Sequence, residues 1–263
     1  MTKVDNFLLA ALAVLVTAAA VIDKENVAAS HYTWDFRNGA ARIQTIALLP
    51  PDVRVTIVRA GGRKPREAET ARVENIATNV TRRRLEQAGY DVVGLTSDQL
   101  AENPRLWGLT RLAERHFERE FQALLQDPRR LEQRTLNIGA AAVRLADQLG
   151  VDALAFQKID AEGAAGSQLV RALSLGSSRG YVRMDLAVVH GTTGDIEGWF
   201  SGRTRGVKAF RLTNYPEKVV TKTARLAYRR LPLAFEGEPE ERDERPFMAG
   251  AEASSADDAA SLD

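Results

Sequence analysis

The order of apolar runs and helical repeats along the chain restricts its fold more than any other sequence feature. Apolar runs bounded by Pro or Gly predict strands, and apolar residues recurring every three to four positions predict helices. The predicted elements are strands at residues 43–49 and 52–59, a loop at 60–65, a helix at 67–88, a strand at 90–95, helices at 109–125 and 136–149, a strand at 153–159, hairpin strands at 181–190 and 197–205, and a helix at 216–230. This order predicts an α/β (α+β) fold in two layers, a mixed β-sheet with helices packed mainly on one face.

The segment at residues 7–22 contains no charged residue. It is shorter than the roughly 20 residues that an untilted helix needs to cross a bilayer, and it suits the apolar core of a signal peptide. Small residues at 17–20 and again at 27–29 offer cleavage sites, although Asp5 offsets Lys3 before the apolar run. Residues 1–29 are therefore expected to be a signal peptide or an uncleaved membrane anchor, with a buried core helix as the alternative.

Charge is distributed unevenly along the chain. Residues 236–263 contain ten acidic residues and two arginines, a net charge of −8, so residues 1–235 carry +9 of the overall +1. The acidic, Ala/Ser-rich composition predicts a disordered tail over 236–263. Residues 30–40 are expected to be a linker and residues 41–235 the folded domain. A basic body can contact anionic lipid, polyanionic glycan or nucleic acid, or be a solvated surface.

Few residue constellations indicate catalysis. The chain has no Cys, which excludes disulfides, thiolate catalysis and Cys-based zinc sites. Residues 176–180 read G-S-S-R-G, the pattern of a nucleophile elbow around Ser178, but an apparent strand follows where that motif needs a helix. His116 and Glu120 lie four residues apart on one predicted helix without a third ligand. Residues 61–64 lack the spacing of a nucleotide-binding loop. We therefore predict no catalytic residue, no cofactor and no metal.

Three groups of residues are candidates for an interaction surface. The arginines Arg82, Arg83 and Arg84 lie on a predicted helix, Tyr32 and Trp34 follow the apolar segment, and Leu169 and Leu173 lie in an apolar insert flanked by Gly and Ser. Packing onto the domain is the alternative for Tyr32 and Trp34, and an ordinary buried strand is the alternative for the insert. Nucleic-acid binding is not expected, since aromatic residues rarely interleave with the arginines.

Three phrases resemble a known family. Residues 46–51 (IALLPP) resemble the first strand of the amino-terminal domain of TolB, which is related to domains of the curli secretion lipoprotein CsgG and of envelope lipoproteins such as LpoB. Residues 149–156 (LGVDALAF) are similar to the helix-to-strand passage of those domains, and residues 186–199 (LAVVHGTTGDIEGW) to their hairpin. The resemblance covers residues 41–231. The chain departs from the family by lacking a lipidated Cys and by having His190 where an acidic residue is frequent.

The resemblance implies a binding function without a catalytic residue. We expect a non-enzymatic binding or assembly component of a bacterial cell envelope. One such role is that of an accessory to an envelope transport or secretion complex. It would lie in the periplasm or on the periplasmic face of a membrane. Its partners would be envelope proteins or further copies of itself, with membrane contact through the N-terminal segment. The alternatives are a serine hydrolase that uses Ser178 and a structural subunit of an envelope ring or pore.

Overall fold

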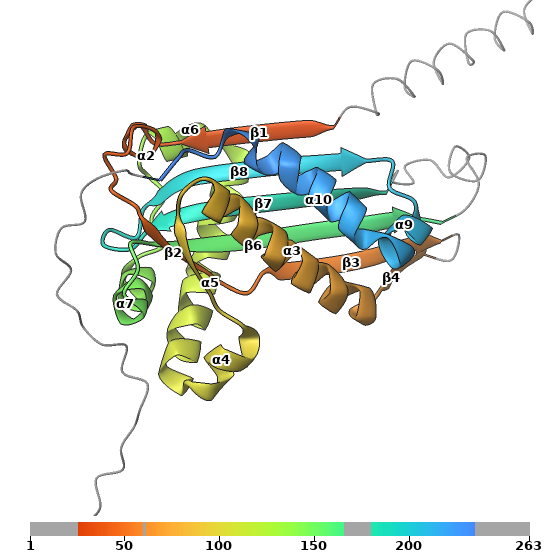
Figure 1. The fold of residues 1–263 in the computed structure, drawn as a ribbon, viewed down its shortest axis with the longest axis horizontal. Coiled ribbons are helices and arrows are strands. Elements are labelled where there is room, and N and C mark those ends of the chain that lie inside the picture. The colour runs from red at the N-terminus through yellow and green to blue at the C-terminus, as the bar shows by residue number, and fades with distance from the viewer. Residues whose placement is uncertain (1–25, 60–61, 166–179, 235–263) are drawn as a thin grey trace, which may run out of the picture.

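The computed structural model of the protein describes residues 26–59, 62–165 and 180–234 (Figure 1). The apolar segment 7–22, the insert with Leu169 and Leu173, Ser178 and the acidic tail lie outside the described residues. Within the described part of the chain, no helix is both long and apolar enough to cross a membrane.

Groups of strands and groups of helices follow one another along the described chain. The strands are β1 (Val27–Tyr32), β2 (Thr45–Leu48), β3 (Asp52–Arg59), β4 (Gly62–Pro65), β5 (Asp91–Gly94), β6 (Ala153–Ala164), β7 (Tyr181–His190) and β8 (Ile196–Arg205). The helices are α2 (Trp34–Arg37), α3 (Glu67–Gln87), α4 (Ser97–Glu102), α5 (Pro104–Gln126), α6 (Arg129–Glu132), α7 (Ala140–Leu149), α9 (Ala209–Asn214), α10 (Pro216–Ala227) and the 3₁₀ turn η1 (Tyr228–Arg230).

The described strands form one mixed sheet of eight strands in the order β1-β8-β7-β6-β2-β5. Strand β2 pairs in parallel with both β5 and β6. After the break at Pro50-Pro51, β3 continues along the same edge of β6, also in parallel, and β4 pairs with β3. The pairs β6–β7, β7–β8 and β8–β1 are antiparallel. The predicted mixed sheet is confirmed, and β3 extends β2.

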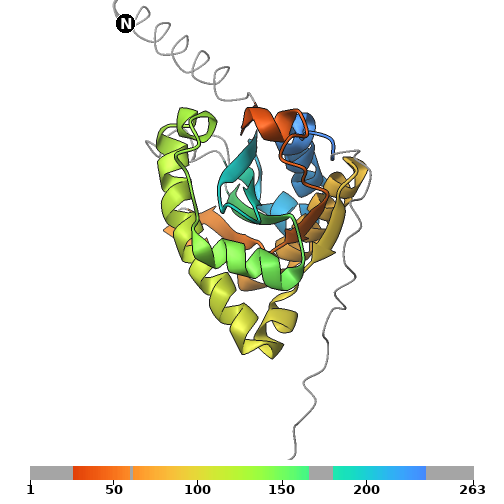
Figure 2. The same cartoon turned by 90° about the vertical axis from the view of Figure 1, so that its left-hand side faces the viewer.

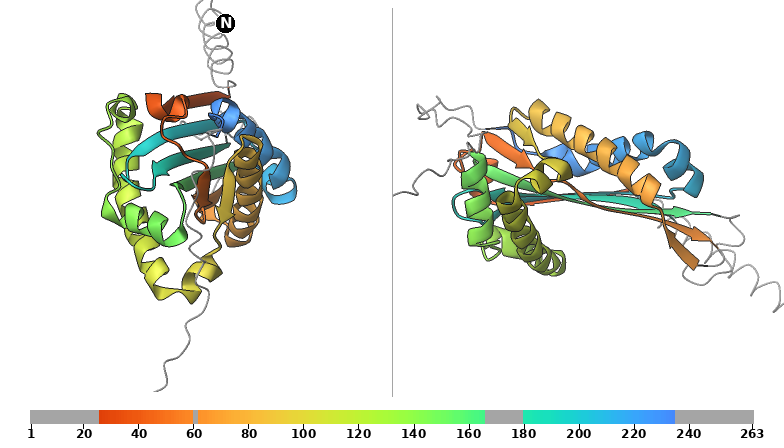
Figure 3. Two further views of the ribbon diagram at one scale, coloured as in Figure 1. Left: turned by 60° about the vertical axis from the view of Figure 1, so that its left-hand side comes forward. Right: turned by 90° about the horizontal axis from the view of Figure 1, so that it is seen from below.

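Two apolar cores lie on opposite faces of this sheet. Successive side chains of a strand point to opposite faces, so Ala155 of β6 joins one core while Leu154 and Phe156 join the other. Helices α3, α9 and α10 cover the first face, and α5 and α7 cover part of the second face (Figures 2 and 3). The helices therefore form two outer layers around the sheet, rather than packing mainly on one face as the sequence predicts.

Two segments differ from the sequence-based expectation. Residues 30–40, expected to be a linker, contain the end of β1 and helix α2, because Phe36 is buried and its ring contacts Tyr90 and Phe200. Residues 60–65, expected to be a loop, contain β4, which pairs with β3 through backbone groups and needs no apolar side chain. Strand β1 also begins inside the segment 1–29, so cleavage after residue 29 would remove half of it.

Helix α10 packs closely on β8. A Cβ atom at Gly202 would lie 2.5 Å from the backbone nitrogen of Ala227 and 2.6 Å from the carbonyl oxygen of Thr223, so only glycine allows this approach. Beside this contact a buried polar triad joins three elements. Gln157 Nε2 of β6 donates to Thr81 Oγ1 of α3 at 2.7 Å and to the Tyr228 hydroxyl of η1 at 3.0 Å. The hydroxyls of Thr81 and Tyr228 are 3.0 Å apart.

The triad gives a stability prediction. Tyr228→Phe removes the hydroxyl that bonds both Thr81 and Gln157, so it should lower the free energy of unfolding by about 1–2 kcal/mol. Urea denaturation followed by circular dichroism measures the change. Tyr215→Phe removes the hydroxyl of a tyrosine that is 53% exposed and is the matched control, expected to have almost no effect. Equal losses in the two variants would contradict a role for the triad.

Candidate functional site

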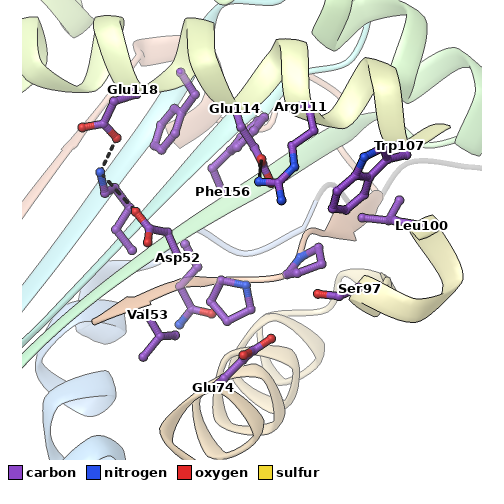
Figure 4. A pocket seen from close by; sticks show the side chains of 15 residues that line it. Asp52, Val53, Glu74, Ser97, Leu100, Trp107, Arg111, Glu114, Glu118 and Phe156 are labelled. Atoms are coloured by element: carbon purple, nitrogen blue, oxygen red, sulfur yellow. Dashed lines mark hydrogen bonds and ion pairs between the residues drawn. The ribbon is translucent and has the colours of Figure 1, made fainter. Parts of the chain in front are cut away.

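A cleft opens at the carboxyl ends of the neighbouring parallel strands β2 and β5 (Figure 4). The chain leaves β2 through Pro50-Pro51 and, after β3 and β4, reaches α3 on one face of the sheet. It leaves β5 through Ser97 of α4 and reaches α5 on the opposite face. The two connections diverge and leave a crevice outside the strand ends, the position at which open α/β sheets commonly bind ligands.

The cleft has a volume of about 450 Å³ and walls from three helices. Glu74 of α3 enters from one side, while Trp107, Arg111, Glu114 and Glu118 of α5 line the other (Figure 4). Phe117 and Phe156 form an apolar part of the wall, with their rings stacked 4.6 Å apart. The cleft thus combines an apolar wall with charged groups that converge from separate elements.

Lys158 of β6 links two of the carboxylates in the cleft. Its Nζ donates to Glu118 and lies 3.6 Å from Asp52 Oδ2. The same Nζ lies 5.2 Å from the centre of the Phe121 ring. This lysine is largely buried, so its charge is balanced by two carboxylates that are themselves about half exposed.

Arg111 is the second cation of the cleft and lies on the α5 wall. Its Nη1 donates to Glu114 Oε2 at 3.1 Å, and its guanidinium carbon lies 4.2 Å from the centre of the Trp107 ring. Trp107 is nevertheless 37% exposed. An aromatic face and a carboxylate are together a recognition site for a cation, and Arg111 occupies it here.

Burial raises the pKa of two carboxyls in the cleft. The pKa of Glu74 lies above its usual value because burial penalises the charged form. The pKa of Glu114 is raised by burial and by the charge of Asp52, against the opposing effect of Arg111. Burial also acts on Glu118, but hydrogen bonds from Lys158 and Gln122 with the charges of Lys158 and Arg54 outweigh it and lower that pKa.

The lining therefore holds four carboxylates against two cations. This excess of negative charge favours a ligand that carries positive charge. In the described part of the chain, no group of three or more His, Asp or Glu side chains has the arrangement of a metal site. The chemistry available in the cleft is the binding of a cation beside an exposed indole ring.

The side chains of the three arginines predicted as an interaction surface point in different directions from α3. Arg83 is exposed, whereas Arg82 lies over Gly94 of β5 and Arg84 donates to Gln87 at 3.1 Å. Consecutive helix residues are about 100° apart, so a run of three cannot form a single face. Of the two predicted aromatic residues, Tyr32 packs toward Phe200 and Trp34 remains 73% exposed. Leu169 and Leu173 lie outside the described residues.

The other candidate groups are held in local contacts. His116 Nδ1 lies 2.9 Å from the carbonyl oxygen of Ile138, and Glu120 accepts from Arg119 Nε at 3.0 Å. His190 Nε2 lies 3.2 Å from the carbonyl oxygen of Ala41. Ser178 lies outside the described residues, but strand β7 begins at Tyr181 directly after the G-S-S-R-G sequence. A nucleophile elbow requires a helix there.

Sequence reasoning did not identify the cleft residues. Asp52, Glu74, Trp107 and Lys158 belong to no motif and are separated by up to about a hundred positions. A signal existed in the positions of Asp52 and Ser97, which follow the predicted strands 43–49 and 90–95, since residues after parallel strands meet at one edge of a sheet.

Together, the sheet and the cleft define an α+β protein with a mixed sheet and a cation-favouring crevice at its strand ends. No family model and no curated protein matches the sequence. A PelC dodecamer from Paraburkholderia phytofirmans is similar at 10% identity, with a TM-score of 0.38 over 77% of this chain and 98% of that chain. Lipoprotein GNA1162 from Neisseria meningitidis is similar at 16% identity, with a TM-score of 0.33 over 68% of this chain and 96% of that chain.

The opposite pKa shifts of Glu74 and Glu118 predict opposite effects of neutralising them. Glu74 binds its proton more tightly in the folded protein than in the unfolded chain, where its pKa is near 4.5. Its contribution to the free energy of unfolding therefore falls as the pH rises through its raised pKa. Glu74→Gln should therefore raise the free energy of unfolding at pH 7, by less than about 1 kcal/mol because the group is partly solvated.

The lowered pKa of Glu118 has the reverse consequence. Its contribution is present above pH 4.5 and is lost as pH falls through the lowered value, so Glu118→Gln should reduce stability at pH 7. Urea denaturation at pH 7 and pH 4 measures both variants. Their opposite effects should shrink toward pH 4, and changes of the same sign at pH 7 would contradict the assignment.

Proposed function

We propose that the chain is an exported, non-enzymatic binding component of a bacterial cell envelope and an accessory to a transport or secretion complex. In this proposal the cleft at the ends of β2 and β5 holds a basic segment of a partner protein. The observation that carries the proposal is the arrangement of Arg111 between the Trp107 ring and the Glu114 carboxylate.

Arg111 shows what the cleft can recognise. Its guanidinium lies on an indole ring, with one carboxylate at hydrogen-bonding distance, and Glu74 lines the same space from α3. A Lys or Arg side chain of a partner would find the same three groups if Arg111 turned outward, which its exposed side chain allows. The raised pKa values of Glu74 and Glu114 mean that an incoming cation would also relieve carboxylates that burial disfavours.

Export is supported by the apolar segment 7–22, and the position of β1 bears on where that segment would be cleaved. The apolar segment 7–22 ends five residues before β1 begins at Val27. Strand β1 pairs with β8 over its whole length, from Val27 opposite Arg203 to Tyr32 opposite Gly198. Cleavage at residues 17–20 would keep this strand, whereas cleavage after residue 29 would remove Val27, Ala28 and Ala29 from the sheet. A mature protein starting near Val21 is therefore favoured over one starting at Ser30.

Cell fractionation with N-terminal sequencing tests export. We expect a C-terminally tagged chain in the periplasmic fraction with an N-terminus near Val21, or an intact chain in the membrane fraction if residues 7–22 are retained as an anchor. An intact chain in the cytoplasm would contradict the proposal. A mature start at Ser30 would contradict the structural argument from β1 while leaving export intact.

Site-specific crosslinking tests the cleft. A photoreactive p-benzoylphenylalanine in place of Trp107 should form an adduct with a second envelope protein in intact cells. The matched control carries the same group in place of Arg144, an exposed residue of α7 that does not line the cleft. Adding Glu114→Lys to the Trp107 reporter should reduce the adduct several-fold, because it places a positive charge where the ligand cation binds. Equal adducts from both positions would contradict a role for the cleft.

A further inference from the structure

We infer that the exposed face of α9 and α10 is a docking surface for an anionic phospholipid bilayer. The surface comprises the exposed residues Lys208, Phe210, Arg211, Tyr215, Lys218, Lys222, Arg225, Arg229 and Arg230. This inference goes beyond the partner-binding cleft, which lies at the ends of β2 and β5. The two can fail separately, because the cleft and this surface share no residue.

The positive charge of the chain is concentrated in this region. Residues 203–230 contain nine Lys or Arg residues and one acidic residue, Glu217, a net charge of +8. Because residues 1–235 together carry +9, almost all of the excess positive charge comes from these 28 residues. Seven of these nine cations belong to the surface defined above, so most of the excess is carried by α9, α10 and the residues at their ends.

Helix geometry arranges these cations in a line. Lys218, Lys222, Arg225 and Arg229 are spaced by four, three and four residues, so they share one side of α10 and its continuation η1. The opposite side of α10 is buried on the sheet through Val219, Val220, Thr223, Ala224 and Ala227. The close contact at Gly202 holds the helix flat on β8, so the row of cations faces outward along its whole length.

Exposed aromatic rings lie at one end of this row. Phe210 of α9 is 49% exposed and Tyr215, which precedes α10, is 53% exposed. Both line a cavity of about 440 Å³ together with Arg205, Arg211, Lys218 and Lys222, and that cavity has no acidic residue in its lining. Lys218 Nζ lies 5.5 Å from the centre of the Tyr215 ring. Aromatic rings that enter the interfacial region, flanked by cations that meet lipid phosphates, are typical of proteins that lie on a membrane.

Strand β1 lies beside the other end of the cation row. Ala28, Ala29 and Ser30 of β1 line one cavity with Leu226, Arg229 and Arg230 at the end of α10. Where residues 7–22 are retained as an anchor, the five residues that lead to β1 span at most about 18 Å, which would keep the C-terminal end of α10 near the lipid headgroups. Basic residues close to a membrane segment each contribute about 1 kcal/mol of attraction to an anionic leaflet, or about fivefold in binding.

A single fluorescent label in the full-length chain tests the inference, since the protein has no Cys of its own. The environment-sensitive dye NBD is attached to Asn214→Cys, an exposed position between Phe210 and Tyr215. On vesicles of phosphatidylcholine with 30% phosphatidylglycerol the emission should rise and shift to the blue, and a lipid-borne quencher should reduce it. Vesicles of phosphatidylcholine alone should give little response at this position, even where residues 7–22 bind them.

Two matched variants make the test specific. The same dye at Arg115→Cys, exposed on α5 on the opposite face of the sheet, should not respond. Lys218→Gln with Lys222→Gln should raise the lipid concentration for half-maximal response at Asn214→Cys roughly 25-fold, at about fivefold for each lysine. Arg115→Gln with Arg119→Gln, which removes two charges at the same spacing from α5, should leave it unchanged.

Several outcomes would overturn the inference. Equal responses of the dye at Asn214→Cys and at Arg115→Cys would show that the protein contacts the vesicle without preferring the α9–α10 surface. An unchanged response in Lys218→Gln with Lys222→Gln would exclude the cation row. An equal response to soluble polyphosphate would assign the surface to free polyanions. The absence of any response on anionic vesicles would contradict the inference.

Discussion

Strand β6 is the element on which the remaining structure depends, and its position is fixed by the residue directly before it, Asp152. The carboxylate of Asp152 accepts hydrogen bonds from the backbone nitrogens of Gln44 and Thr45 at 3.0 and 2.8 Å and from Thr45 Oγ1 at 2.9 Å. These bonds join the start of β2 to the start of β6 and fix their parallel register. From there β6 pairs with β2 and then β3 along one edge and with β7 along the other. Its alternating side chains supply both apolar cores.

A strand that is buried on both faces requires helices on both faces, and the cleft is a consequence. Because α3 covers one side of the sheet and α5 the other, the chain must diverge after β2 and β5, which opens the crevice outside their ends. Adjacent residues of β6 then serve the two sides: Lys158 points to the carboxylates of the cleft, while Gln157 points to the triad under α10. The candidate site and the packing of α10 therefore depend on the register of one strand.

Local sequence predicted the elements well and their layering poorly. The helices α3, α5, α7 and α10 follow from periodicity, because each buries one face with a regular apolar repeat. The β7–β8 hairpin follows from two runs on either side of the turn sequence at residues 191–194. The two-layer prediction overlooked that residues 46–49 and 153–156 are apolar at every position, which is typical of strands covered on both faces. Strands β1 and β4 contain mostly small or charged residues, and their pairing is decided by β8 and β3. The cleft residues carry no local signal, since only the folded chain brings Glu74, Trp107 and Lys158 together.

The cleft and the α9–α10 surface carry opposite charge and lie on different sides of the molecule. The cleft lining is negative and lies between α3 and α5, whereas the positive charge of residues 203–230 is carried largely by α9 and α10 on the face of the sheet opposite α5. A molecule with this asymmetry does not approach an anionic bilayer at random, because the field of the surface turns its basic side inward and its acidic side outward. With α10 against lipid, the α5 wall of the cleft would face away from the membrane, where a basic segment of a partner could reach Trp107. Membrane contact would then orient the binding site as well as hold the protein in place.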